Sequence, residues 1–269
     1  MQLDTLRIVG NGPGKTVEPV ANQLTITFNP TIGSRPMWGE IQISNWKHAG
    51  LPTACRPFVV AAPTLGSAWC QQFEDQLRHS AKTLEPLLGC FPSSGLAAVH
   101  AAMLLAKHVS VCRMPLMPSF VRAADMPPRK PLPGAFHNWL GERRLGLSLL
   151  RKYGPERLIW ESLSLVTVMD IGERTDSNPL MMLTNLFSQG KSIQESEFTE
   201  ALEQLAGFEQ SAWIHNADET WLMGLERHFF LSRHSSDTPS WWLYSNRISL
   251  PLDNILHRLM LCQLELAGN

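Results

Sequence analysis

Charged residues and cysteines are both scarce in this chain, and each shortage argues against a class of protein. Charged residues make up 17% of the 269 residues and the formal net charge is −1, so nothing indicates a nucleic-acid-binding protein, which needs an excess of positive charge. The five cysteines are odd in number and include no Cys-x-x-Cys pair. This argues against a zinc or redox site and is typical of a reducing compartment.

Long apolar runs and targeting segments are also lacking. No run approaches the roughly 18–20 apolar residues that span a bilayer. The opening Met-Gln-Leu-Asp-Thr has neither a basic region nor a small-residue cleavage site. The 44% hydrophobic content is nevertheless enough for a full core. We therefore expect a cytoplasmic protein that is at most peripheral to a membrane.

The hydrophobic pattern predicts an α/β domain followed by a helical region. Helical patterns over 68–88, 96–105 and 135–153 alternate with short strand-like runs, which predicts a mostly parallel sheet with helices on both faces. The predicted strands are 6–9, 24–28, 40–44, 58–62, 109–112 and 157–160. Beyond residue 163 the predicted elements are the helices 180–190, 195–207, 220–232 and 252–266. We expect domains at 1–162 and 163–269, the second packed on the first.

The first predicted strand runs into a glycine turn, Gly10-Asn11-Gly12-Pro13-Gly14-Lys15-Thr16. A strand followed by a glycine turn is typical of the opening of a nucleotide-binding α/β domain. A Walker A loop would need glycine in place of Val9, and a GxGxxG motif would need it in place of Lys15. The turn is compatible with a nucleotide but does not favour a kinase or an ATPase.

A second turn, Pro92-Ser93-Ser94-Gly95, precedes an apolar run that continues to Lys107. Serine is a good helix N-cap, so a helix buried on most sides is expected from Leu96 to Leu105. The free N–H groups and positive dipole end of such a helix suit a phosphate or a carboxylate. Most turns of this kind are plain helix caps, so this one indicates a ligand site only in combination with the glycine turn and the pair His137 and Glu142.

His137 and Glu142 lie across the start of the predicted helix 135–153. Imidazole titrates near neutrality and suits a general base that takes a proton from a hydroxyl, with a nearby carboxylate to orient the ring. An ordinary histidine beside a surface glutamate is the alternative. His100, within an apolar helix, is expected to be a core residue.

Two further features of the sequence can each be explained either structurally or functionally. Two basic clusters are either solvated surfaces or a landing patch for anionic lipid or a phosphorylated acceptor. The Trp241-Trp242-Leu243-Tyr244 cluster either packs in the core, as such clusters more often do, or stacks on sugar rings or touches lipid. The basic clusters are Arg122, Arg129 and Lys130, and then Arg143, Arg144, Arg151 and Lys152.

Three motifs, taken in order, resemble the sialylmotifs of the eukaryotic-type sialyltransferases, glycosyltransferase family 29. Val9-Gly10-Asn11-Gly12 with Phe28-Asn29-Pro30 resembles the large motif, Pro92-Ser93-Ser94-Gly95 the small one, and His137-(x4)-Glu142 the very small one. The resemblance covers about residues 5–162. It implies a three-layer Rossmann-like sheet, a sialyltransferase-like variant of the GT-A fold, with a helical C-terminal extension.

The resemblance also implies an activity: inverting, metal-independent transfer of a sugar from a CMP donor, with no cofactor. His137 would deprotonate the acceptor hydroxyl and Glu142 would support it. Asn11 and Ser93 are expected to converge with His137 on one cleft. The implied donor-binding residues are Gly10, Asn11, Gly12 and Asn29, for the phosphate or ribose, and Ser93, Ser94 and Gly95, for the sugar carboxylate and nucleotide.

The chain departs from the family in two places. The family's His-Tyr-Tyr-type motif should lie just before His137, where Lys130-Pro131-Leu132-Pro133-Gly134 stands instead, and Arg122, Arg129 and Lys130 are candidate substitutes in neutralising the leaving phosphate. The two cysteines of the family's disulfide would fall at Leu6 and Ala106. Their joint loss suits a reducing cytosol and points to a bacterial cytoplasmic enzyme.

The expected donor is CMP-sialic acid or CMP-Kdo, because both sugars carry a carboxylate. The expected acceptor is a lipopolysaccharide or another surface-glycan precursor made at the inner membrane, with peripheral membrane contact as an option. Two alternatives stay open. One is a non-catalytic relative that keeps the fold and at most binds nucleotide, and the other is a nucleotide-dependent enzyme built on the turn 10–16.

Overall fold

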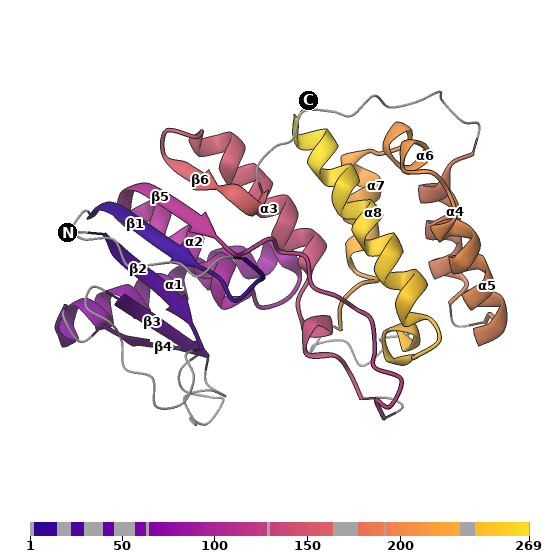
Figure 1. Ribbon diagram of the computed structural model, residues 1–269, viewed down its shortest axis with the longest axis horizontal. Coiled ribbons are helices and arrows are strands. Elements are labelled where there is room, and N and C mark those ends of the chain that lie inside the picture. Colours follow the sequence, from indigo (N-terminus) through magenta and orange to yellow (C-terminus); the bar gives the residue numbers. More distant parts are fainter. Residues whose placement is uncertain are drawn as a thin grey trace. The chain divides into compact units, whose positions relative to one another are not determined.

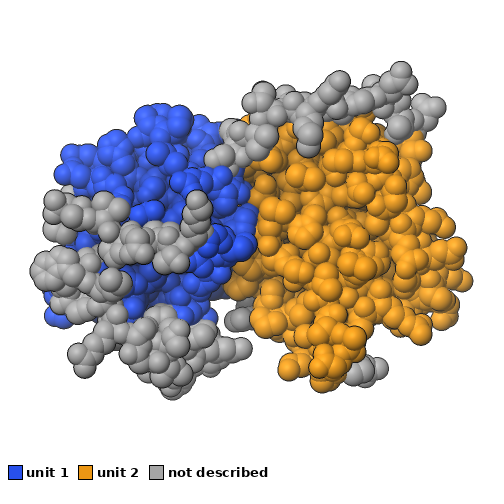
Figure 2. Space-filling model, in the orientation of Figure 1, with its two compact units in different colours: residues 1–115, 148–164 blue, residues 116–147, 165–269 orange. Residues whose placement is uncertain are grey.

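A computed structural model describes residues 3–14, 23–29, 40–45, 57–62, 65–127, 130–163, 177–190, 192–231 and 240–268. The chain forms two compact units (Figure 2). Unit 1 consists of Met1–Pro115 and Ser148–Ser164, and unit 2 of Leu116–Leu147 and Leu165–Asn269. The stretch 116–147, expected within the domain 1–162, therefore belongs to unit 2 together with the helical region.

Unit 1 is built on a six-stranded sheet of order β4-β3-β2-β1-β5-β6 (Figure 1). All pairs are parallel except β3 with β4. The predicted strands and the mostly parallel sheet are confirmed. The strands are β1 Leu3–Val9, β2 Leu24–Phe28, β3 Glu40–Asn45, β4 Phe58–Ala61, β5 Ala106–Cys112 and β6 Leu158–Trp160.

The strand order changes direction between β1 and β5. From β1 the chain moves outward to β2, β3 and β4, and then returns to place β5 on the other side of β1, with Ile8 beside both Ile26 and Val111. This arrangement is compatible with a Rossmann-like fold. In such sheets a crevice forms at the carboxyl ends of the two strands where the order reverses, and ligands bind there.

The two faces of the sheet differ in polarity because side chains alternate along every strand. On one face, side chains such as Leu6, Ile8 and Val111 are fully buried. On the other face, the intervening positions include Arg7 and Ser110, which are half-buried. Parallel sheets are normally apolar on both faces, whereas this sheet carries polar side chains at these positions of its second face.

Helices α1 (Ser67–Leu88) and α2 (Ser94–Leu105) pack on each other and form one layer on the sheet. Helix α1 contacts β4, and α2 contacts β1, β3 and β5. The described residues of unit 1 thus make two layers. Among the residues that the structure describes, α1 and α2 lie on one face, and the expectation of helices on both faces stays a prediction. The connections 15–22, 30–39 and 46–56 lie outside the described residues.

Helix α2 is buried on most sides, as predicted, and passes into β5 without a loop, since Leu105 ends the helix and Ala106 begins the strand. Arg157 donates hydrogen bonds to the carbonyl oxygens of Met103 and Ala106, both at 3.3 Å, which satisfies acceptors at this junction. His100 is half-buried and its Nδ1 lies 3.0 Å from Ser80 Oγ. Burial lowers the pKa of His100.

Unit 2 is helical, and its C-terminal helix α8 (Ser249–Gly268) packs against α5, α6 and α7 (Figure 1). Asp218 caps α7 by accepting hydrogen bonds from the backbone of Thr220 and Trp221. The short helix α6 was not predicted from the sequence. The other helices are α3 Trp139–Tyr153, which ends in unit 1, and α4 Pro179–Ser188, α5 Glu195–Ala206, α6 Gln210–His215 and α7 Glu219–Glu226.

The tryptophan cluster is part of the core of unit 2. Trp242 is 1% exposed, and its ring centroid lies 5.0 Å from that of Phe187 and 5.4 Å from that of Phe198. Its Nε1 donates to the carbonyl oxygen of His228 at 2.8 Å, and Trp241 Nε1 donates to that of Gly190 at 2.6 Å. Packing, rather than sugar stacking or lipid contact, accounts for these two side chains.

His228 makes the stability of unit 2 sensitive to acid. Its ring stacks on Phe187 at 4.5 Å, and burial, followed by the charge of Arg227, lowers the pKa of His228 from 6.5 to about 4. Between these values the unfolded chain binds a proton that the folded protein does not. Stability is therefore lost as the pH falls from 6.5 to 4, by at most about 3 kcal/mol.

We expect His228→Phe, which keeps a stacking ring and removes the titration, to flatten the acid limb of a curve of unfolding free energy against pH. The free energy is measured by urea denaturation at pH 4 to 7. His79→Phe is the control, because His79 is exposed and should leave the slope unchanged. An equally steep acid limb in His228→Phe would contradict the assignment.

Candidate functional site

The residues predicted to form the site fall into two sets, one in each unit. The first set lies in unit 1 and the second set in unit 2. The expectation that both sets meet in one cleft stays a prediction. The first set is Gly10, Asn11, Gly12, Asn29, Ser93, Ser94 and Gly95, and the second is His137 and Glu142.

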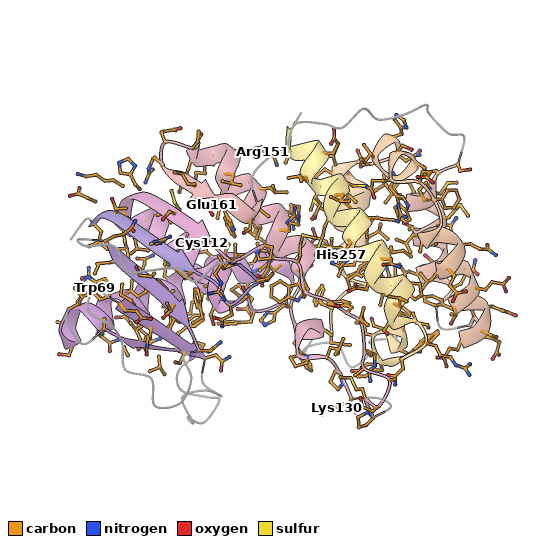
Figure 3. All side chains as sticks on the ribbon, viewed as in Figure 1. Trp69, Cys112, Lys130, Arg151, Glu161 and His257 are labelled. Atoms are coloured by element: carbon orange, nitrogen blue, oxygen red, sulfur yellow. The ribbon has the colours of Figure 1, made fainter. Side chains whose placement is uncertain are left out.

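The glycine turn lies at the carboxyl end of β1, beside the end of β5 at Cys112 (Figure 3). The N–H of Gly10 donates to Cys112 O and that of Gly12 to Arg113 O, both at 2.9 Å. A Cβ at either glycine would collide with the Arg113 carbonyl oxygen. These glycines therefore allow residues 113–115 to approach the turn, and their N–H groups are used inside the fold rather than aimed at a phosphate.

Asn11 and Asn29 each use one end of the side-chain amide to hold the loops at this edge. Asn11 Nδ2 donates to Phe28 O at 3.2 Å, and Asn29 Oδ1 accepts from Asn45 N at 3.0 Å. Among the described residues, the opposite ends, Asn11 Oδ1 and Asn29 Nδ2, have no hydrogen-bond partner. These two polar atoms remain available to a ligand. Pro30, the last residue of the large-motif resemblance, lies outside the described residues, as do Lys15 and Thr16.

The Ser-Ser-Gly turn is the N-terminus of α2, as predicted. Ser93 is the N-cap, and its Oγ accepts from Leu96 N at 3.2 Å. A Cβ at Gly95 would lie 2.5 Å from Met114 Sδ, so this turn borders the segment 113–115 that also contacts the glycine turn. A helix N-terminus and the switch point of the sheet thus share one edge, an arrangement that suits an anionic ligand.

His137 and Glu142 form a pair in unit 2. His137 Nδ1 lies 3.7 Å from Glu142 Oε1, and the side chains are 32% and 0% exposed, respectively. The carboxylate is thus buried behind Nδ1, and the histidine keeps an exposed side. A carboxylate facing Nδ1 favours the tautomer that carries its proton there, which leaves Nε2 able to accept a proton.

The helix that carries Glu142 begins later than predicted. A 3₁₀ turn occupies Pro133–Phe136, and α3 starts at Trp139 rather than at residue 135. Asn138 sets this start, since its Oδ1 accepts from Gly141 N at 2.9 Å and its carbonyl oxygen from Glu142 N at 2.8 Å. His137 is therefore outside the helix, directly before its cap.

Residues from the C-terminal helical region hold this cap. Glu226 of α7 accepts from Asn138 Nδ2 at 3.0 Å and forms an ion pair with Arg144, whose Nε lies 2.6 Å from Glu226 Oε1. Gln263 of α8 donates to Leu140 O at 2.9 Å. No local sequence pattern predicts this cluster, because Asn138 and Glu226 are 88 residues apart.

Arg122 serves a structural purpose. It is 5% exposed, and its guanidinium donates to Asn246 Oδ1 and Lys130 O at 2.6 Å and to Pro127 O at 3.1 Å. It fixes the backbone at Pro127 and Lys130 and is not free to neutralise a phosphate. Of the other candidate substitutes, Lys130 is exposed (Figure 3) and Arg129 lies outside the described residues.

Helix length, metal-ligand groups and cysteines can be stated for the described ranges. None of their helices is both long and apolar enough to cross a membrane. They contain no group of three or more histidine, cysteine, aspartate or glutamate side chains able to hold a metal ion. Their four cysteines, Cys70, Cys90, Cys112 and Cys262, are free, and Cys55 is outside these ranges.

Comparisons of the chain with protein-family models, curated proteins and solved structures found no match.

Proposed function

We propose that this chain is an inverting, metal-independent glycosyltransferase that moves a carboxylated ulosonic sugar, sialic acid or Kdo, from its CMP donor to a hydroxyl group. One observation carries the proposal: the N-terminus of α2 and the glycine turn border the same segment at the switch point of the sheet. That edge is where a Rossmann-like sheet binds a nucleotide. The resemblance to the sialylmotifs supports the choice of donor, and a sialyltransferase-like variant of the GT-A fold is part of the proposal.

The donor is held by its two anionic groups and its ribose. The first turn of α2, from Ser93 to Gly95, offers N–H groups and a positive dipole end to the sugar carboxylate and the nucleotide. Asn11 and Asn29 offer the amide ends that they do not use in the fold. Both proposed donors carry a carboxylate, so one cradle serves either sugar.

In the transfer step, the acceptor oxygen attacks the anomeric carbon as the bond from that carbon to the phosphate oxygen breaks. Nε2 of His137 takes the hydroxyl proton, and CMP leaves with the electron pair of the broken bond. Glu142, buried behind Nδ1, stabilises the imidazolium that results. Attack from the side opposite the leaving phosphate inverts the anomeric configuration.

The acceptor is proposed to be a surface-glycan or lipopolysaccharide precursor, which places the enzyme in the cytoplasm with peripheral contact at the inner membrane. A second candidate is a non-catalytic relative that keeps the fold and at most binds nucleotide. It is favoured by one observation, that Asn11 and Asn29 both spend one end of the amide inside the fold. Such a protein would bind CMP and transfer nothing.

Thermal unfolding of the purified protein with CMP, CDP, UMP and ATP, with and without Mg²⁺, tests the proposal. A ligand at 100 times its Kd stabilises the folded state by about 2.7 kcal/mol. We expect CMP to raise the Tm equally with and without Mg²⁺, and CMP-sialic acid or CMP-Kdo to be consumed when an acceptor is added. Stabilisation by ATP with Mg²⁺ but not by CMP would overturn the proposal. CMP binding with neither transfer nor donor hydrolysis would establish the non-catalytic candidate.

A further inference from the structure

Arg113 stands at the edge where the glycine turn meets the end of β5. It follows Cys112, the last residue of β5, and its backbone has a φ of 54°, in the left-handed region. A residue other than glycine is uncommon in this region and is typically held there by its surroundings, often at a ligand site. The backbone thus turns sharply at the switch point of the sheet, and the side chain of Arg113 starts from that turn.

The side chain of Arg113 is anchored along the glycine turn. Its Nε donates to Gly12 O at 2.9 Å. Its aliphatic part runs over Gly14, where a Cβ would lie 3.0 Å from Arg113 Cγ. The glycine turn therefore provides space and a hydrogen-bond acceptor for the side chain of Arg113. This explains its glycines more specifically than a general role as a phosphate-binding loop would.

The two terminal nitrogens of this guanidinium are available. Over the described ranges Arg113 has a single hydrogen-bond acceptor, Gly12 O, and no carboxylate is paired with it. Its side chain is half-buried, so it is neither dispersed in solvent nor sealed in the core. Anchored at Nε, the guanidinium keeps its two-pronged edge, which matches the spacing of phosphate oxygens.

We propose that Arg113 is the phosphate-binding cation of the donor site. It would neutralise the leaving phosphate in place of the family's His-Tyr-Tyr-type motif, which this chain lacks. This inference rests on the proposed function, because the ligand is the phosphate of CMP. Met114, the next residue, lies against Gly95 of the α2 N-terminus, so the guanidinium and the helix dipole act on the same edge of unit 1. The structure assigns to Arg113 what the sequence suggested for Arg122, Arg129 or Lys130.

A cation at the phosphate is needed because negative charge increases there during the reaction. The phosphodiester of a CMP-sugar carries one negative charge, and CMP leaves as a phosphate monoester that carries a second. A guanidinium already fixed at that phosphate stabilises the second charge as the bond to the anomeric carbon breaks. No proton has to be supplied to the leaving group.

The test compares CMP with cytidine, which differ by the phosphate alone, in calorimetric titrations of wild type, Arg113→Gln and Arg113→Lys. We expect Arg113→Gln to raise the Kd of CMP roughly 10- to 100-fold and to leave that of cytidine within about twofold. Arg113→Lys should fall between, because lysine keeps the charge and loses the fork. Arg151→Gln is the matched control, since Arg151 is an exposed arginine of the same unit (Figure 3) and should change neither Kd.

The outcomes separate this inference from the proposed function. A wild type that does not bind CMP overturns both. A wild type that binds CMP, together with an Arg113→Gln variant that binds it equally well, overturns the inference alone. Unchanged cytidine affinity shows that a variant is folded. If Arg113→Gln does not fold, Arg113→Lys decides, and an unaltered ratio of the CMP and cytidine Kd values in that variant overturns the inference.

Discussion

Replacing His137 with alanine is expected to reduce the rate of sugar transfer by roughly 10²- to 10⁴-fold, the usual contribution of a general base. His137 is the exposed member of a pair whose carboxylate is buried, so the substitution removes the proton acceptor and leaves the carboxylate without its imidazole. The rate is measured as CMP released from CMP-sialic acid or CMP-Kdo in the presence of an acceptor. The Kd of CMP should change little, because in the proposed mechanism the base contacts the acceptor and not the nucleotide.

His79→Ala is the control for this variant, since His79 is an exposed histidine on α1 and should keep the wild-type rate. Transfer by His137→Ala within threefold of the wild-type rate would mean that another group takes the proton. Loss of CMP binding together with transfer would point instead to a structural defect.

Replacing Glu226 with alanine is expected to lower the free energy of unfolding by about 3 kcal/mol. Glu226 is 6% exposed, and its removal would take away the carboxylate that pairs with Arg144 and accepts from the Asn138 amide, both in low-dielectric surroundings. Breaking one side of a buried ion pair typically costs about 3–5 kcal/mol, and the lower end applies because the Arg144 side chain is 17% exposed. Urea denaturation measures the loss.

Two comparisons test the reason for that loss. Glu200→Ala removes an exposed carboxylate from α5 and should cost less than about 0.5 kcal/mol. The double variant Arg144→Met with Glu226→Leu should be more stable than Glu226→Ala, since it removes both charges of the pair and fills their space with apolar side chains. A loss below 1 kcal/mol in Glu226→Ala would mean that water already solvates the pair.

The elements of unit 1 were predictable from the sequence because their signals are local. The alternation in Leu24–Phe28 and the serine cap before Leu96 each lie within a few residues, and both elements form where expected. The start of α3 was misplaced because Pro133 begins a 3₁₀ turn and Asn138 supplies the cap, and these compete with a helical pattern that already fits from residue 135.

Which residues make up the candidate site was harder to predict from the sequence, because its main contacts join residues far apart in the chain. Arg113 reaches the turn through Gly12, 101 residues earlier, and Glu226 reaches Asn138 across 88 residues. Neither contact leaves a pattern in a window of the sequence. The pattern of Gly10 and Gly12 predicts a turn compatible with a nucleotide, whereas the structure shows that both positions need glycine because the Arg113 carbonyl oxygen lies against them.

The division of the chain sets an order in which the two cores can close during synthesis. The segments of unit 1 are complete at Ser164, whereas unit 2 needs the segment 116–147 and the chain from residue 165 onward. Phe120 and Leu140 belong to a core that includes Ile255 and Leu259 of α8. At about 5–20 residues per second, the ribosome needs roughly 5–20 s to make the chain between Ser164 and the end of α8. For that interval the core that buries the apolar side chains of the segment 116–147 is incomplete, because α8 supplies the last part of it.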